Sequence, residues 1–121
     1  MRVTLGNNEL NNGRTYKLSA FDKVDEPIVH FDNDPSKRYT IMMIDVNADN
    51  YIHLLVINNT QSIADYKPPS PPKGTHKYVI YIIEQKSFIE PFSLSTRRPF
   101  DISKMTRKGA VVDTFTFNVS A

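Results

Sequence analysis

The residues best suited to chemistry lie in a proline-rich loop and in the apolar segment that follows it. Residues 68–78 read Pro-Pro-Ser-Pro-Pro-Lys-Gly-Thr-His-Lys-Tyr and lead directly into a β-branched run. Proline restricts the shapes of the loop, and Gly74 permits a sharp turn or a close backbone approach. The alternation of a strand then places His76 and Tyr78 on one face. This pattern indicates either a ligand pocket or a hairpin entry.

A carboxylate and a second histidine lie at the ends of two other apolar segments. Asp45 follows residues 39–44 and opens a polar turn, and His53 lies just inside residues 52–57. If these strands neighbour the one that begins near Tyr78, the side chains of Asp45, His53, His76 and Tyr78 meet at one end of the sheet. Imidazoles and turn N–H groups donate to phosphate or carboxylate oxygens, and a carboxylate orients and charges an imidazole. Charge-assisted hydrogen bonds contribute roughly 1.5–3 kcal/mol each, so two or three predict a weak to moderate anion site.

The same residues have structural interpretations. A histidine in an apolar strand is often a satisfied core residue, and an aspartate at a strand end is often a turn-former. Ser70, His76 and Asp45 are the residue types of a hydrolase, but prolines flank the serine and no Gly-x-Ser-x-Gly elbow is present, so we expect no enzyme. The histidines lack tight metal-binding spacing, so we expect no metal. No cofactor is expected either. A further group of basic side chains is interpreted as a solvated face: Arg97, Arg98, Lys104, Arg107 and Lys108.

Length and composition narrow the class of protein. The 121 residues, 40% of them hydrophobic, predict one domain, 1–121, with a single core. The net charge of +2 is too small for a dedicated nucleic-acid binder, and the lack of cysteine excludes disulfides and thiolate chemistry. The longest apolar runs are strand-sized, well below the roughly 20 residues of a membrane helix. No basic-then-apolar leader opens the chain, so we expect a cytoplasmic protein.

The pattern along the chain predicts an all-β protein. Residues 39–44 and 52–57 are apolar on both faces, as in central strands covered by two layers. One helical turn is expected at 101–106, with Asp101 as its N-cap. Short strands separated by Gly, Pro and Asn turns favour an antiparallel two-sheet β-sandwich. The expected strands are 2–5, 16–18, 27–31, 39–44, 52–57, 78–83 and 111–117.

Residues 39–58 and residues 65–85 resemble the two signatures of the phosphatidylethanolamine-binding protein family, which includes the Raf kinase inhibitor protein and the plant flowering-time regulators. Asp65-Tyr66, then residues 70–79, then Glu84-Gln85 are similar to the second signature of that family. The first signature, an Asp-Pro-Asp-x-Pro turn between an apolar strand and a histidine-containing strand, is matched in outline by residues 39–58. With weaker likeness at both ends, the resemblance covers nearly the whole chain.

The resemblance implies a two-sheet fold with a small anion pocket at one end. In the family that pocket accepts phosphate, acetate or a phospholipid headgroup, and the proteins regulate signalling or inhibit proteases. Carried over by position, the pocket residues are Asp45, His53, Pro71, Pro72, His76 and Tyr78, with Tyr51, Ser70, Gly74 and Arg97 in support.

The chain also departs from the family. Residues 45–49 lack both prolines of the first signature and its second aspartate, and this removes rigidity that would hold turn N–H groups toward an anion. The chain stops after its last expected strand, without the C-terminal helix of animal members, so we expect a more open pocket or one covered by a partner chain. Two functions therefore remain: a soluble module that binds an anion and regulates a protein such as a kinase or protease, or an interaction domain with a vestigial pocket.

Overall fold

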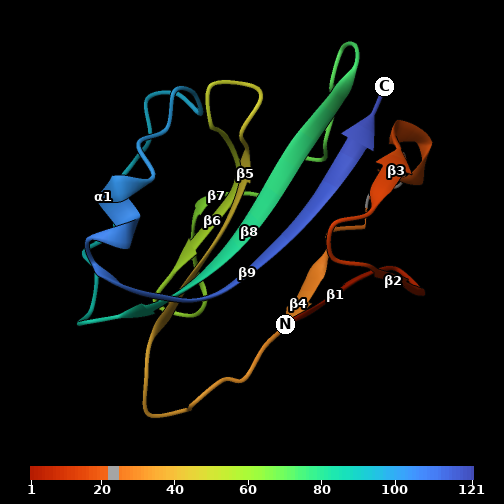
Figure 1. Ribbon diagram of the computed structural model, residues 1–121. Helices are drawn as coiled ribbons and strands as arrows, with labels where there is room; N and C mark the ends of the chain where they lie inside the picture. Colours follow the sequence, from red (N-terminus) through yellow and green to blue (C-terminus); the bar gives the residue numbers. More distant parts are fainter. Residues whose placement is uncertain (22–24) are drawn as a thin grey trace.

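The computed structural model describes residues 1–21 and 25–121 and shows two β-sheets (Figure 1). The large sheet has the order β3 (Thr15–Lys17), β9 (Gly109–Ser120), β8 (Thr75–Gln85), β5 (Tyr39–Asp45), β6 (Tyr51–Ile57), β7 (Gln61–Ala64). The small sheet has the order β2 (Asn8–Leu10), β1 (Arg2–Leu5), β4 (Ile28–His30). Two single helical turns complete the described elements, η1 (Leu18–Phe21) and α1 (Ser103–Thr106).

The two-sheet all-β class predicted from the sequence is confirmed, and each expected strand is present. Three short elements were not expected, namely β2, β7 and η1, because three or four residues are too few to show a period. The antiparallel prediction is wrong for one pair, since β3 runs parallel to β9. No tight turn joins these two strands, which are about a hundred positions apart in the chain, so hairpin geometry does not set their direction.

The helical turn lies where the sequence predicts it, but its cap differs. The residue before the first helical turn is Ile102, which cannot cap through its side chain, so Asp101 is not the N-cap. The Asp101 carboxylate nevertheless accepts hydrogen bonds from the backbone N–H of Ser103 at 3.0 Å and from its hydroxyl at 2.6 Å. The aspartate therefore supports the start of α1 from one position further out.

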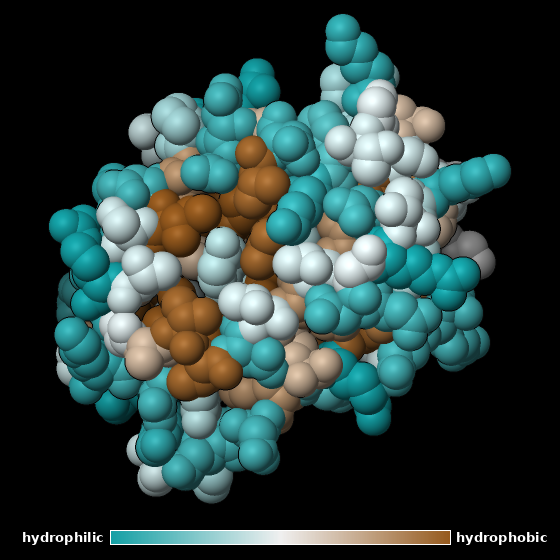
Figure 2. Space-filling model, viewed as in Figure 1, coloured by the Kyte–Doolittle hydropathy of each residue, from teal (hydrophilic) through white to brown (hydrophobic). Residues whose placement is uncertain are grey.

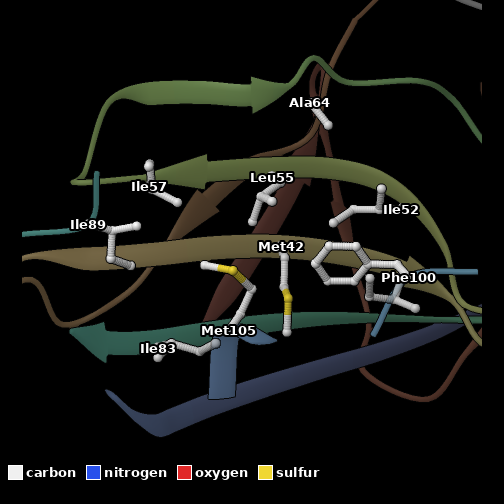
Figure 3. Close-up of a cluster of buried hydrophobic side chains, with 10 residues drawn as sticks. Met42, Ile52, Leu55, Ile57, Ala64, Ile83, Ile89, Phe100 and Met105 are labelled. Atoms are coloured by element: carbon white, nitrogen blue, oxygen red, sulfur yellow. The ribbon is translucent and has the colours of Figure 1, made fainter. Parts of the chain in front are cut away.

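Two hydrophobic cores lie on opposite faces of the large sheet, so the expectation of a single core is wrong. The first forms where β5, β6 and β8 meet α1 and the segments around it, and Figure 3 shows Phe100 and Met105 against side chains of these strands. The second lies under the small sheet and includes Tyr78, Phe115 and Phe117. This arrangement confirms that the central strands are covered by two layers. The first core consists of Met42, Ile44, Ile52, Leu55, Ile57, Ala64, Ile83, Ile89, Phe100 and Met105.

Hydrophobic side chains also reach the surface on the side of the molecule where α1 lies, surrounded by hydrophilic residues (Figure 2). Phe88 and Phe92 are among the exposed large side chains of the segment that precedes α1. Within the described chain, no helix is long and apolar enough to cross a membrane.

The burial of core side chains predicts which substitutions lower the stability of the protein. Ile44 is fully buried on β5, so Ile44→Ala is expected to lower the free energy of unfolding by about 2–5 kcal/mol through lost contacts and a new cavity. Ile28 is 57% exposed on β4, and Ile28→Ala is expected to change it by less than about 0.5 kcal/mol. Chemical denaturation of both variants measures the difference, and equal losses would contradict this placement of the core.

Candidate functional site

The C-terminal end of β5 and the starts of β6 and β8 lie together at one end of the large sheet. β5 pairs antiparallel with both neighbours, so its last residue, Asp45, lies opposite Tyr51 on β6 and Tyr78 on β8. A cavity of about 280 Å³ opens at this end of the sheet. Seven of the residues expected from the sequence line it: Asp45, Tyr51, His53, Ser70, Pro71, Pro72 and His76.

A buried carboxylate holds one of the two histidines. Asp45 is 3% exposed, and its Oδ2 lies 2.7 Å from Nδ1 of His76. Its other oxygen accepts a hydrogen bond of 2.9 Å from the backbone N–H of Asn47. Both carboxylate oxygens are therefore engaged, and Nε2 is the His76 nitrogen left for a ligand.

The second histidine owes its position to a β-bulge. Met43 pairs with Leu54 and Ile44 with Ile52, so His53 is an extra residue on β6 with no partner on β5. A bulge of this kind re-aims a side chain and is common beside functional sites. Ile52 and Leu55 both pack in the first core, whereas the His53 ring meets Tyr78 edge-on with ring centroids 5.3 Å apart.

Hydrogen bonding and burial define the state of His53. Its Nδ1 lies 2.7 Å from the carbonyl oxygen of Lys67, and the backbone N–H of Lys67 donates to the His53 carbonyl at 2.8 Å. Burial lowers the pKa of His53, against a smaller raising effect of the Lys67 hydrogen bond. The neutral imidazole that donates from Nδ1 presents Nε2 as an acceptor.

Tyr78 lies beneath the cavity and does not line it. Its ring stacks on Phe117 at 5.4 Å, and its hydroxyl oxygen is buried with no hydrogen-bond partner in the described structure. Burial and, to a smaller extent, the nearby Asp45 carboxylate raise its pKa, so the phenol stays protonated at neutral pH. The phenol thus lies behind the cavity wall, close to the buried Asp45 carboxylate.

Hydrogen bonds hold the turn that lacks the family's prolines. The backbone N–H of Val46 donates to the carbonyl of Lys77 at 3.0 Å, and the Asn47 side-chain oxygen accepts from the Lys77 N–H at 2.7 Å. Asp49 and Asn50 take positive φ values of 52° and 54°, which asparagine and aspartate tolerate better than other residues. The turn is therefore tied to β8 even though its prolines are missing.

Two of the supporting residues lie outside the cavity lining. Gly74 has a φ of 70°, and its carbonyl accepts from the backbone N–H of Ala121 at 2.9 Å, so it shapes the loop end. Arg97 donates from Nη1 to the carbonyl of Ile52 at 3.1 Å and from Nη2 to that of Asp65 at 2.9 Å. Arg97 thus braces the start of β6 and the loop after β7, and not the turn after β5.

Sequence reasoning missed three lining residues: Ala48, Lys67 and Arg98. Lys67 and Arg98 bring two positive charges to the cavity. The sequence pattern assigns Arg98 to a solvated face, and Lys67 carries no periodic signal because it lies in a loop. The Arg97-Arg98 pair was the one available signal. Within residues 1–21 and 25–121, no three His, Cys, Asp or Glu residues are grouped to hold a metal ion.

The fold is that of the phosphatidylethanolamine-binding proteins. The carboxypeptidase Y inhibitor in a crystal structure with its cognate proteinase superposes with a TM-score of 0.71 at 15% identity, covering 90% of this chain and 76% of that one. This likeness shows the fold, and it agrees with the two-sheet architecture expected from the sequence motifs.

Two curated proteins are similar in sequence. Protein MOTHER of FT and TFL1 homolog 2 of Oryza sativa subsp. japonica is 26% identical over an alignment of 103 positions that covers 72% of this chain. Putative odorant-binding protein A5 of Drosophila melanogaster is 27% identical over an alignment of 124 positions that covers 83% of this chain. The chain spans 58% of the length of each of these relatives, and no protein-family model matches it. The resemblance to the phosphatidylethanolamine-binding protein family that the sequence predicted is confirmed.

The two adjacent arginines should differ in their effect on stability. Arg97→Met removes two hydrogen bonds to backbone carbonyls, so the free energy of unfolding is expected to fall by about 1–3 kcal/mol. The Arg98 side chain is exposed, and the residue makes its hydrogen bonds only through its backbone. Arg98→Met is therefore expected to change the free energy of unfolding by no more than about 0.5 kcal/mol. Urea denaturation compares the two, and a larger loss for Arg98→Met would refute the bracing role of Arg97.

Burial of His53 should make stability depend on pH. Because its folded pKa lies below the usual 6.5, the unfolded chain takes up the proton first, and stability is lost as pH falls from about 6.5 toward the lowered value. His53→Gln is therefore expected to lose less stability than the wild type between neutral and acidic pH. His30→Gln, at an exposed histidine on β4, serves as the control. An unchanged acid slope in His53→Gln would contradict the burial effect.

Proposed function

We propose that this chain is a binding module that captures a small anion in the cavity between β5, β6 and β8 and thereby regulates a protein partner. The observation that carries the proposal is the pairing of His76 Nδ1 with the buried Asp45, which leaves Nε2 of His76 for a ligand in the cavity. A phosphate, a carboxylate or the headgroup of a phospholipid has the acceptor oxygens that such a site requires.

The charge around the cavity supports an anionic ligand. When an anion accepts from Nε2 of His76, the Asp45 carboxylate on the other side compensates the charge of a protonated imidazole. The hydroxyl of Ser70 adds a donor at the exposed rim, and Lys67 and Arg98 add positive charge. Each charge-assisted contact is worth roughly 1.5–3 kcal/mol, so the affinity expected from two or three is micromolar to millimolar.

A regulated protein partner is the second part of the proposal. The structural neighbour with a TM-score of 0.71 is an inhibitor solved with its cognate proteinase, so this fold can present a surface to an enzyme. A protease is accordingly the class of partner that we propose, and a kinase, expected from the sequence resemblance, is the alternative class. The alternative, an interaction domain with a vestigial pocket, is motivated by the missing prolines of residues 45–49. The hydrogen bonds of Asn47 favour a working pocket over that alternative.

We further propose binding without catalysis. Ser70 is exposed and flanked by Pro69 and Pro71. The hydrogen bond that holds His76 joins its Nδ1 to the Asp45 carboxylate and not to Ser70. A nucleophilic serine requires a base within hydrogen-bond reach, and the Ser70 hydroxyl makes no such bond in the described structure. A cytoplasmic setting stays a prediction from the sequence.

The proposal predicts a specific loss of anion binding in His76→Ala. Inorganic phosphate is expected to shift the ring resonances of His53 and His76 in the wild type, whereas His76→Ala should bind it at least ~10-fold more weakly because one charge-assisted contact is gone. His30→Ala removes an exposed histidine of the small sheet and should leave the titration unchanged. No histidine shift in the wild type at high phosphate would remove the basis of the proposed function.

A further inference from the structure

The cavity has a cationic rim that neither the sequence motifs nor the comparisons assign. Lys67 and Arg98 line it from two separate loops, one before the proline-rich run and one before α1. None of the four ion pairs within residues 1–21 and 25–121 includes either side chain. Both charges are thus available to a ligand.

The main chain around both cations is fixed. Lys67 exchanges two hydrogen bonds with His53, and its Nζ lies 5.8 Å from the centroid of the Tyr51 ring, a cation–π arrangement that keeps it over the mouth. Arg98 follows Arg97, whose carbonyl accepts from the N–H of Ile52 at 2.9 Å. The rim is therefore positioned by β6, the same strand that carries His53.

The cavity offers little to a cation. Among its lining residues the only carboxylate is that of Asp45, which is buried and already engaged by His76 and Asn47. An ammonium group in the mouth would meet Lys67 and Arg98 instead. The wall that faces a ligand is thus positive, and no free acidic side chain on it balances a positive headgroup.

We propose that Lys67 and Arg98 make this pocket selective for a phosphate monoester dianion over the zwitterionic headgroup of a phosphodiester lipid, a preference that rests on the anion-binding function proposed above. A monoester carries about −1.5 to −2 charges at pH 7. A phosphodiester carries one negative charge, and an ethanolamine ammonium cancels it. Two rim cations attract the first ligand more strongly and repel the ammonium of the second.

The proposed distinction rests on the charge at the rim of the cavity and not on the cavity volume of about 280 Å³. Because the two rim side chains are exposed, salt screens their effect. The preference for the monoester should therefore be largest at low ionic strength and shrink as salt is added.

The test compares glycerol 3-phosphate with glycerophosphoethanolamine, which differ in the second charge and in the ammonium group. At low ionic strength, calorimetry is expected to give at least ~10-fold tighter binding of glycerol 3-phosphate to the wild type. In a Lys67→Met/Arg98→Met double variant the ratio should fall to within about threefold, because the rim charge is gone. Both residues make their hydrogen bonds through the backbone, so the double variant keeps them.

A matched control is Lys73→Met. Lys73 is an exposed lysine of the proline-rich residues 68–78, and its side chain does not line the cavity. It should retain the wild-type ratio. Equal affinity of the wild type for the two probes overturns the selectivity while leaving anion binding intact. If neither probe binds and inorganic phosphate gives no histidine shift, the proposed function itself fails.

One more arm distinguishes the source of the monoester. Sedimentation with phosphatidylcholine vesicles that contain phosphatidic acid tests a lipid monoester, and pure phosphatidylcholine vesicles are the control. Sedimentation only with phosphatidic acid supports selectivity toward a monoester on a membrane. Binding of glycerol 3-phosphate without sedimentation supports a soluble monoester. Equal sedimentation with both vesicles contradicts selectivity by charge.

Discussion

The buried carboxylate of Asp45 is the interaction on which the arrangement of the site depends. A carboxylate that is 3% exposed must be hydrogen-bonded, because an isolated buried charge is costly. Asp45 meets this requirement through Nδ1 of His76 on β8 and the backbone N–H of Asn47 in the following turn. One side chain thereby joins two neighbouring strands and the turn at the open end of the sheet.

The rest of the site is built around that constraint. The turn after β5 is tied to β8 through Val46 and Asn47, so the histidine and the turn keep a fixed relation. On the other side of β5, Arg97 braces the start of β6, where the bulge carries His53. The turn that lacks the prolines of the first signature is thus held by hydrogen bonds of Val46 and Asn47 to β8.

Most of the fold, and the cavity-lining residues at the strand ends, could be predicted from the sequence. The apolar runs of β5, β6 and β8 are long enough to be recognised, and their ends carry Asp45, His53 and His76. Lys67 and Arg98 could not be placed, because loop residues have no periodicity and their position depends on hydrogen bonds between distant segments. Tyr78 shares a face with His76 but lies two residues further into the strand, roughly 6.6 Å deeper, and so it lies beneath the cavity without lining it.

The bulge in β6 has a consequence for how the site is encoded. Along a regular strand, Ile52 and Leu55 would point to opposite faces, yet both are fully buried in one core. The single additional residue is what allows the histidine to leave the alternation while the isoleucine rejoins it. The ligand-facing imidazole is therefore specified by the length of the strand as much as by residue type, and loss of one residue there would exchange the places of a core side chain and a site side chain.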